Sequence, residues 1–437
     1  MTTDISSDTL ALAGGAPAHT HRPATYPRFS SAAYERVRGT LDQGPMQGLS
    51  KRHPVIAELE RALAAYHGVE HCLAASSGHG ALQSALIGLE ITGGDEVITS
   101  PYSWGASVSC ILHNGAVPVF ADVHPDTGLL DAARLDALVT PRTAAVLVPH
   151  LYGQPADMTA ICAFAERHGL AVIEDGSQAH GARHRGARVG SFGDASGFST
   201  NGVKPLATTE GGYLVTRRAD VYWKATISCQ HAGRGELLGR ASEPGFPDEL
   251  RPWIDSLVYT YRPNLVSALF ALDRLPHLDE ENAARRRNVA LLREQLAGVE
   301  SVRFVDYASE DECVFHMVTL NFDAEHAGVS RDTYLRALQA EGVPAVGYVE
   351  QGLHHSPRLS PDWAGPRVMW TEAIRRSGYD PTQAELPGCD AKVARSIELP
   401  WNCHVVDERL VASIARAFVK LEGQLDGLRA VEAAAAP

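Results

Sequence analysis

The chain contains no long hydrophobic stretch and few cysteines. No apolar run among its 437 residues approaches the length that spans a membrane. The opening segment, MTTDISSDT, lacks the basic start and apolar core of a secretory signal peptide. The 7 cysteines are scattered and form no CxxC pair, which favours reduced thiols over a disulfide framework or a zinc site. We therefore expect a cytoplasmic protein that does not associate with membranes.

Basic charge is also scarce. The 39 lysines and arginines against 52 acidic residues give a formal net charge of -13, and no dense basic cluster offsets it. This balance disfavours binding to nucleic acid or to anionic membranes. No GxGxxG opens a helix after an early strand, which disfavours a nicotinamide-dependent dehydrogenase. The apolar content of 45% is ordinary for a globular protein, and the length allows a large and a smaller domain.

One central stretch has the composition of a ligand site. A short apolar run ends on Glu174 and Asp175, as in a buried parallel strand whose end reaches the ligand-binding edge of a sheet. A second strand-like piece, Ala195 to Ser199, precedes Lys204, and hydroxyls and glycines surround this lysine. The pattern predicts an acid and an amine near the same sheet edge.

A strand-end acid and a downstream lysine are the groups that a pyridoxal phosphate enzyme needs. The acid keeps the pyridinium nitrogen protonated so that the ring can take up electrons, and the lysine forms a Schiff base. Asp175 and Lys204 suit these roles, and Ser199 lies where a hydroxyl could bind the cofactor phosphate. The alternative interpretation is an ordinary buried strand followed by a surface lysine.

The motifs of this stretch resemble those of the DegT/StrS-type sugar aminotransferases, which aminate keto-sugars or keto-cyclitols. The shared segments are ED-G-S-Q-A-H-G-A, V-G-S-F-G-D, the F-S before Lys204, and E-G-G. The resemblance implies that Asp175 and Lys204 are catalytic, that Gln178 contacts the ring hydroxyl of the cofactor, and that Ser199 contacts its phosphate. It also implies an α/β fold of the pyridoxal phosphate-dependent transferase fold type I. Such a fold has a mainly parallel sheet flanked by helices in a large domain, and a smaller α+β C-terminal domain.

Further motifs extend the resemblance over residues 8 to 425. A Ser-Gly segment before a helix pattern is similar to the family's phosphate-binding S-G-T-x-A-L, with Gly78 retained and His79 in place of the threonine. Trp104 matches the aromatic residue that stacks on the cofactor ring. Thr260 replaces the asparagine of the N-Y-R segment, which reaches the neighbouring subunit's cofactor phosphate. The resemblance therefore implies a homodimer with shared active sites.

Four residues are candidates for the substrate pocket. His150 and Tyr152 belong to an HLYG segment, although a strand-end histidine is as often structural. Tyr348 and His354 lie in a segment similar to the family's Y…PLHxxP signature, in which the small domain folds back over the site. We expect no metal ligand among the site residues.

The change of character near residue 280 predicts the domain organisation. We expect a loosely held arm over 1–25, a large cofactor-binding domain over 26–280, a small domain over 281–425 and a frayed tail over 426–437. Strand candidates in the small domain are 302–305, 313–322 and 343–349.

These features together predict a pyridoxal phosphate-dependent aminotransferase acting on small molecules. It would transfer an amino group from L-glutamine or L-glutamate to a keto-sugar or keto-cyclitol in amino-sugar or antibiotic biosynthesis. The early LALAGGAPA segment is similar to members that act on cyclitols, and it favours glutamine. One alternative is dehydrating or aromatising chemistry like that of aminohydroxybenzoate synthases. Lys204 disfavours the dehydratase branch, which has histidine there, and a non-catalytic regulatory protein is the remaining alternative.

Overall fold

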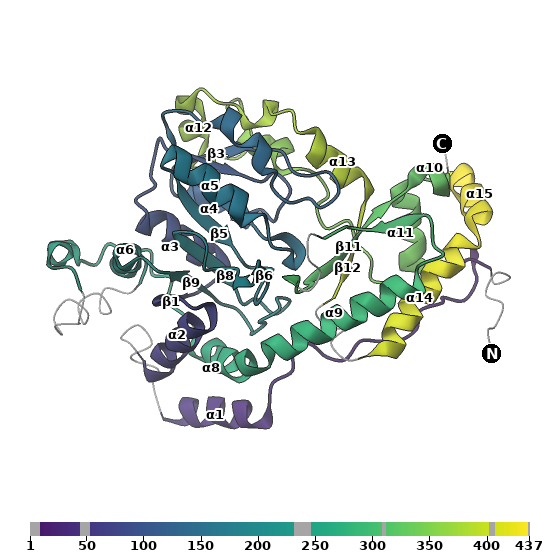
Figure 1. Cartoon of the computed structure of the whole chain (residues 1–437), viewed down its shortest axis with the longest axis horizontal. Coiled ribbons are helices and arrows are strands. Elements are labelled where there is room, and N and C mark those ends of the chain that lie inside the picture. Colours follow the sequence, from purple (N-terminus) through teal and green to yellow (C-terminus); the bar gives the residue numbers. More distant parts are fainter. Residues whose placement is uncertain (1–8, 44–52, 231–245, 308–311, 402–406, 436–437) are drawn as a thin grey trace.

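The computed structural model describes residues 9–43, 53–230, 246–307, 312–401 and 407–435. Figure 1 shows a larger body built around a seven-stranded sheet and a smaller one built around a three-stranded sheet, with the long helix α9 (Leu278–Gln295) reaching from one to the other. Within the described residues, no helix is both long and apolar enough to cross a membrane.

The large sheet is mainly parallel, as predicted. Its strand order is β1-β9-β8-β5-β4-β2-β3, and only β9 runs antiparallel to its neighbours. The strands are β1 (His71–Ala75), β2 (Glu96–Thr99), β3 (Val117–Phe120), β4 (Thr143–Pro149), β5 (Ala171–Asp175), β8 (Ala195–Ser199) and β9 (Gly212–Thr216). A short hairpin, β6 (Arg183–His184) with β7 (Ala187–Arg188), lies between β5 and β8 in sequence.

Helices cover both faces of this sheet because apolar side chains alternate along its strands. In β1, Leu73 packs into the core that contains α3, whereas Ala74 packs into the core that contains α2. One face is covered by α2 (Pro54–His67), α8 (Leu265–Arg274) and α5 (Met158–His168), and the other by α3 (Gly78–Gly88), α4 (Ala106–His113) and α6 (Ala219–Cys229). The α1 helix (Ser31–Asp42) lies against α8.

The small sheet is antiparallel, in the order β10-β11-β12. It consists of β10 (Val302–Phe304), β11 (Met317–Phe322) and β12 (Ser396–Pro400), and it packs with α11 (Arg331–Ala340) and α14 (Glu408–Glu422) around one apolar core. The strand predicted over 343–349 is wrong, since this segment contributes one isolated bridge, between Val346 and Glu398. Pro344 within it has no N–H group for a ladder hydrogen bond.

The N-terminal arm is more firmly packed than the sequence suggested. In its described part, Leu10 is buried in the small-domain core. The buried carboxylate of Glu341 accepts hydrogen bonds from the backbone N–H groups of Ala11 and Ala18, both at 2.8 Å. His19 is buried and hydrogen-bonded to Ser413 Oγ at 2.9 Å. A buried carboxylate needs donors, and the arm supplies them.

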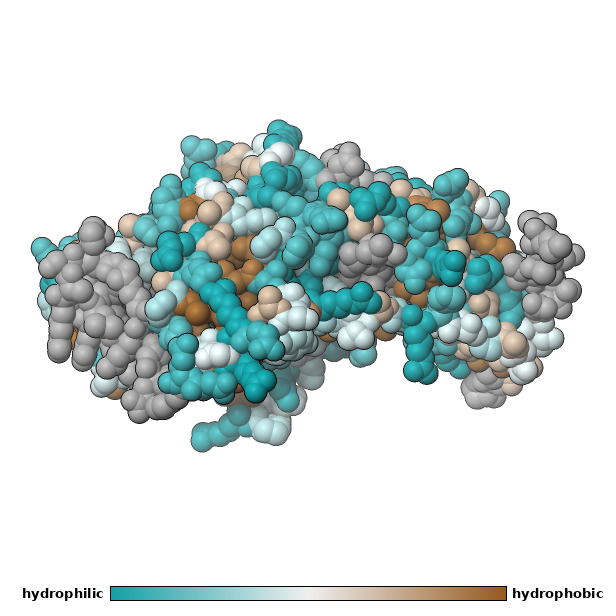
Figure 2. All heavy atoms as spheres, turned by 90° about the horizontal axis from the view of Figure 1, so that it is seen from below, coloured by the Kyte–Doolittle hydropathy of each residue, from teal (hydrophilic) through white to brown (hydrophobic). Residues whose placement is uncertain are grey.

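The C-terminal tail also differs from the expected frayed segment. Residues Leu425–Ala435 form helix α15, in which Leu428 is buried in the small-domain core. The Arg429 side chain donates a hydrogen bond from Nε to the backbone oxygen of Ala327 at 3.0 Å. Among the residues of the predicted tail, 436 and 437 lie outside the described part. The face in Figure 2 is mainly hydrophilic with smaller apolar areas, because most apolar side chains fill these cores.

Candidate active site

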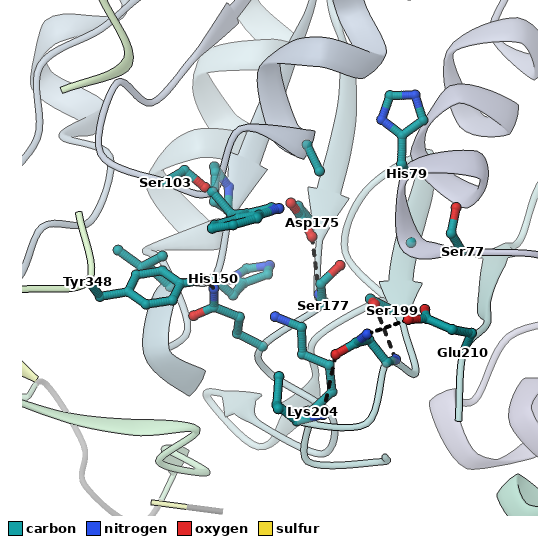
Figure 3. A pocket seen from close by; sticks show the side chains of 18 residues that line it. Ser77, His79, Ser103, His150, Asp175, Ser177, Ser199, Lys204, Glu210 and Tyr348 are labelled. Atoms are coloured by element: carbon teal, nitrogen blue, oxygen red, sulfur yellow. Dashed lines mark hydrogen bonds between the residues drawn. The ribbon is translucent and has the colours of Figure 1, made fainter. Parts of the chain in front are cut away.

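A cavity of about 430 Å³ opens at the carboxyl edge of the large sheet (Figure 3). Parallel strands end at the same edge, so the loops that follow them meet there although they are far apart in sequence. The cavity is lined by Ser77, Gly78, His79, Ser103, Trp104, His150, Asp175, Ser177, Gln178, Ser199, Lys204, Glu210 and Tyr348, among others. The site predicted from separate motifs is therefore largely assembled in one place.

Asp175, the last residue of β5, presents a held carboxylate to the cavity. Its Oδ2 accepts a hydrogen bond from Ser107 Oγ at 2.7 Å, and its Oδ1 accepts one from the backbone N–H of Ser177 at 3.1 Å. The side chain is buried, and Asp175 forms no salt bridge within the described residues. The two donors fix the carboxylate, and no salt bridge within the described residues competes for it.

Lys204 lies in the loop between β8 and β9, and its side chain points into the cavity (Figure 3). Burial lowers the pKa of the Lys204 amine below its ordinary value, and the nearby carboxylate of Asp175 opposes this effect. A lowered pKa increases the fraction of neutral amine, which is the nucleophilic form. The arrangement therefore combines an activated amine with a carboxylate across the same cavity.

The N-terminus of α3 forms another wall. Ser77 caps the helix by accepting a hydrogen bond from the Gly80 N–H at 3.0 Å. A Cβ at position 78 would lie 2.5 Å from Ser199 Cβ, so only glycine permits this close approach of α3 to the end of β8. Helix N–H groups and a serine hydroxyl thus share one corner, the arrangement that binds phosphate.

His79, at the position of the family's threonine, contacts α4. Its Nδ1 lies 3.2 Å from Ser109 Oγ and its Nε2 lies 3.0 Å from His113 Nδ1. Burial, together with the neighbouring His113, lowers the pKa of the His79 ring, so it is neutral at pH 7. Figure 3 shows the ring directed away from Lys204. His79 can therefore contribute its backbone N–H to the corner, but its imidazole does not replace the hydroxyl.

Aromatic side chains close the side opposite α3. Trp104 is 61% exposed, and its ring centroid lies 6.1 Å from that of Tyr348. Gln178 donates a hydrogen bond from Nε2 to the Tyr348 hydroxyl at 3.2 Å and accepts one from the Tyr152 N–H at 2.8 Å. Burial raises the pKa of Tyr348 to about 12, so the phenol keeps its proton at neutral pH. Tyr348 brings the small domain into contact with the site, as the sequence predicted.

Three predicted site residues do not line the cavity in this chain. Tyr152 is buried, with its hydroxyl 3.0 Å from that of Tyr102. His354 is buried against Phe120, with a centroid distance of 6.2 Å. Thr260 is exposed and donates a hydrogen bond from Oγ1 to its neighbour Val258 O at 3.3 Å. Tyr152 stays close to the site through its ring contact with Tyr348.

Glu174, next to the catalytic candidate Asp175, points the other way and holds the following loop. It accepts hydrogen bonds from His150 Nε2 (3.1 Å) and from three backbone N–H groups and one serine hydroxyl between 190 and 196. The Ala156 N–H donates to Nδ1 of His150, so the ring carries its proton on Nε2, toward Glu174. Burial opposes ionisation of Glu174, but these donors outweigh it and lower the pKa of this carboxyl.

Replacing Glu174 by glutamine is expected to destabilise the fold by about 2–4 kcal/mol at pH 7, because an amide NH₂ would face backbone donors. The stability that comes from ionised Glu174 is present above its unfolded pKa of roughly 4.3 and is lost as pH falls through the lower folded value. Urea unfolding should therefore show a wild-type advantage at pH 7 that shrinks below about pH 4. Glu58→Gln, in an exposed pair with Arg36, is the control and should cost less than about 1 kcal/mol. Equal losses in the two variants would contradict the structural role of Glu174.

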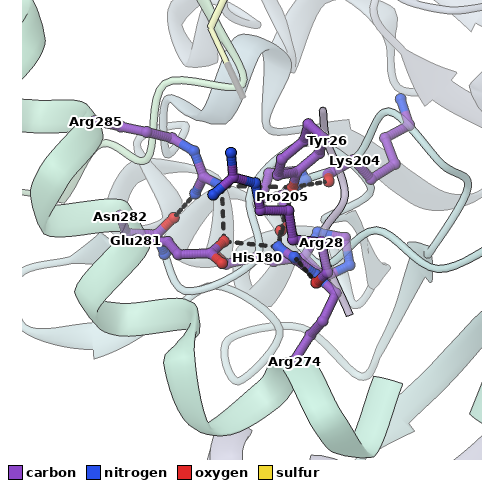
Figure 4. Close-up of polar contacts among 9 residues, drawn as sticks. All are labelled: Tyr26, Arg28, His180, Lys204, Pro205, Arg274, Glu281, Asn282 and Arg285. Carbon is purple, nitrogen blue, oxygen red and sulfur yellow. Dashed lines mark hydrogen bonds and ion pairs between the residues drawn. The ribbon is translucent and has the colours of Figure 1, made fainter. Parts of the chain in front are cut away.

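Two supports of the site carried no recognisable sequence signal. Ser107 is one of many serines, and only the fold shows that its hydroxyl bonds Asp175. Tyr26, on the N-terminal arm, places its hydroxyl 2.7 Å from the backbone oxygen of Lys204 and 2.8 Å from that of Pro205 (Figure 4). The Tyr26 ring lies near the guanidinium groups of Arg274 and Arg285, at 5.0 and 5.9 Å from its centroid. The arm is thus hydrogen-bonded to the backbone of the lysine loop.

Tyr26→Phe is expected to lower kcat by on the order of tenfold, because removing the hydroxyl frees the backbone that aims Lys204. KM should change less than kcat, since Tyr26 does not line the cavity. Steady-state kinetics measures both effects, and Tyr34→Phe on the exposed face of α1 is the matched control. A Tyr26→Phe enzyme with unchanged kcat would show that the loop holds its shape without this contact.

The parallel sheet, the carboxyl-edge cavity and its facing acid and lysine define a fold-type-I enzyme of the pyridoxal phosphate class. Residues 32–377 match the profile of the DegT/DnrJ/EryC1/StrS aminotransferase family. The chain belongs to this family and is an aminotransferase; members of the family depend on pyridoxal phosphate.

The relatives resemble the chain over nearly its whole length. An L-glutamine:2-deoxy-scyllo-inosose aminotransferase of Streptomyces paromomycinus is 33% identical over 94% of this chain and 97% of its own. The enzyme of the same name in Streptoalloteichus tenebrarius is 35% identical over 96% and 99% of the two chains. A crystal structure of DesI in the presence of its TDP-sugar product has 28% identity and a TM-score of 0.76, with 98% of both chains covered.

Proposed function

We propose that this aminotransferase binds pyridoxal phosphate in the cavity and transfers the amino group of L-glutamine to a keto-cyclitol. One observation carries the proposal. Lys204 and Asp175 face each other across one cavity, and the N-terminus of α3 forms part of the wall of that cavity. When bound, the cofactor supplies an aldehyde that links to an amine and a ring that takes up electrons.

The residues present fit that group. The Lys204 amine matches the aldehyde, the Asp175 carboxylate matches the ring nitrogen, and the corner formed by Gly78 and Ser199 matches the phosphate. Each contact pairs groups of complementary charge or reactivity. Within the described chain neither Lys204 nor Asp175 forms a salt bridge that would compete for these partners. Gln178 and Trp104 line the same space, and in this proposal they would contact the ring hydroxyl and the ring face.

Each residue then has a task in the amino transfer. Lys204, once its amine is free, is the base that moves a proton at the substrate carbon that carries the nitrogen. Asp175 keeps a negative charge beside the ring nitrogen, held in place by Ser107 and Ser177. The Tyr348 hydroxyl lines the cavity and can donate a hydrogen bond to a hydroxyl of a cyclitol. Both ring nitrogens of His150 are bonded to Glu174 and Ala156, so His150 shapes the cavity wall.

We further propose that a second copy of the chain completes the site. Trp104 and Val203, which line the cavity, are 61% and 60% exposed, and Tyr259, beside Thr260, is 51% exposed. Burying these apolar side chains against a second copy would be favourable. Thr260 of the partner subunit would then reach the phosphate corner. The six described cysteines form no disulfide with one another, in keeping with a place in the cytoplasm.

The test is an absorbance spectrum of the cofactor-loaded protein before and after L-glutamine or L-glutamate is added. The proposal is supported if glutamine converts the visible absorbance band of the bound cofactor and 2-deoxy-scyllo-inosose then restores it. Mass spectrometry should also detect the aminated product. Conversion by glutamate alone would change the donor. Return only with a nucleotide-linked keto-sugar would change the acceptor class, and a band that ignores both donors would move the function to non-transaminating chemistry.

A further inference from the structure

We propose that His354, His355 and Asp390 form a Zn²⁺ site outside the aminotransferase cavity. His354 and His355 lie in the short helix η9 (Leu353–His355), and Asp390 lies in α13 (Pro387–Arg395). One nitrogen from each ring and one carboxylate oxygen all lie within 4.8 Å of one another. None of the three lines the cavity that contains Lys204.

A hydrogen bond between His355 and Asp390 explains two of these residues but leaves the third unexplained. His355 Nε2 lies 3.0 Å from Asp390 Oδ1, and both side chains are about half exposed, so they form an ordinary surface pair. His354, by contrast, is 1% exposed, and neither of its ring nitrogens has a hydrogen-bond partner among the described residues. Buried polar atoms are normally satisfied, because desolvating them without a partner costs free energy. A metal ion bound to Nε2 would give that nitrogen the partner that it lacks.

The spacing fits a tetrahedral ion. With metal–ligand bonds of about 2.0–2.1 Å, the ligand atoms of tetrahedral zinc lie roughly 3.3 Å apart. Asp390 Oδ1 lies 3.0 Å from His355 Nε2 and 3.8 Å from His354 Nε2, which are values on either side of that separation. Two imidazoles and a carboxylate suit Zn²⁺, and the exposed side leaves a position for water.

The surroundings already hold the ligands in place. A Cβ at Gly352 would lie 2.4 Å from Cε1 of His354, so the ring is packed directly against the backbone and has little freedom to turn. The α13 helix is fixed at its start by the Asp122 carboxylate, which accepts hydrogen bonds from the N–H groups of Gly388 (2.8 Å) and Cys389 (2.9 Å). Preset ligands lower the ordering cost of binding an ion.

A bound ion would join η9 to α13 close to the active site. The Leu353 N–H donates a hydrogen bond to Pro101 O at 2.8 Å, in the turn that leads to Trp104. Tyr348, which lines the cavity, lies in the same segment as η9. The ion would therefore act as a structural clamp on the part of the small domain that closes the site, without touching the reacting groups.

The experiment measures Zn²⁺ binding to the cofactor-loaded, chelator-treated protein by isothermal titration calorimetry and elemental analysis after dialysis. The variants are His355→Ala and Asp390→Asn, whose exposed side chains make misfolding an unlikely complication. His168→Ala is the matched control, because His168 pairs with the exposed Asp136 at 2.7 Å without a third ligand. A further readout is the visible spectrum with Co²⁺, which reports tetrahedral coordination.

One equivalent of zinc is expected for the wild type and for His168→Ala. Removing either exposed ligand should weaken zinc binding by at least about a hundredfold. Even the replacement of a residue that only hydrogen-bonds a metal ligand costs about ten- to a hundredfold in metal affinity. Zinc should also raise the melting temperature of the wild type but not that of His355→Ala. Undiminished binding in His355→Ala and Asp390→Asn, or no binding by the wild type at about 100 μM zinc, would overturn the proposal.

Discussion

Lys204→Ala is expected to lower kcat by about 10³-fold or more, and to abolish covalent attachment of pyridoxal phosphate to the protein. Removing a general base alone costs about 10²–10⁴-fold, and in the proposed function the same amine also attaches the cofactor. Reduction with borohydride followed by mass spectrometry of the peptides measures attachment independently of turnover. The label should appear on the peptide that contains Lys204 in the wild type and on no peptide in the variant.

Two further variants test whether the loss of activity comes from the missing amine, from the missing positive charge or from a general effect of replacing a lysine. Lys204→Arg keeps a positive charge, but guanidinium stays protonated at working pH and cannot attack the aldehyde, so it should be as inactive as alanine. Lys224→Ala removes a lysine that pairs with the exposed Glu90, and it should leave kcat within about twofold, as expected for a surface pair of small energy. A small added amine should partly restore proton transfer in Lys204→Ala. Borohydride labelling of another lysine in the wild type would exclude Lys204 from the role.

Asp175→Asn is expected to lower kcat by about 10²–10³-fold, the loss typical of removing one preorganised electrostatic contact. Asparagine keeps the size of the side chain and can still accept the Ser177 N–H, so the substitution removes mainly the charge. KM for the amino donor should change far less, because in the proposed function Asp175 contacts the cofactor ring and not the amino donor. Steady-state kinetics with both substrates measures the split.

Ser107→Ala provides a graded comparison for the Asp175 result. It removes the 2.7 Å hydrogen bond to Asp175 Oδ2 but leaves the carboxylate in place, so it should cost about tenfold or less. Asp136→Asn, an exposed carboxylate outside the cavity, should have no measurable effect on kcat. An Asp175→Asn enzyme as active as Asp136→Asn would contradict the assignment of the ring-nitrogen contact.

The elements of the large domain could be predicted because each follows from local pattern. Short apolar runs bounded by polar residues, such as the one ending at Asp175, are typical of buried strands, and polar or glycine-rich residues after each run mark the carboxyl edge. The cavity therefore gathers Gly78, Trp104 and Lys204 as the motifs predicted. In the small domain the third strand was misplaced. Pro344 is a local signal against a strand over 343–349, but only the finished fold shows that 396–400 pairs with β11.

Contacts between distant segments could not be read from the sequence. Glu174 and Asp175 are adjacent and chemically alike, and only the alternation of side chains along β5 assigns one to the loop and the other to the cavity. His79 could have pointed toward the phosphate corner, but His113 and Ser109 on α4 hold it. The closeness of Tyr26 to Lys204 likewise depends on how the arm crosses the finished fold.

The path of the N-terminal arm limits how far the two sheets can separate. The arm is fixed to the small domain at His19, which bonds Ser413, and to the lysine loop at Tyr26. The seven Cα–Cα steps from residue 19 to residue 26 span at most roughly 25 Å when fully extended, so a wide swing of the small domain would break one of these attachments. Substrates would then enter through local movements of single loops and not through a wide separation of the domains. The length of the arm between its two attachments sets the largest distance by which the small domain can move away from the lysine loop.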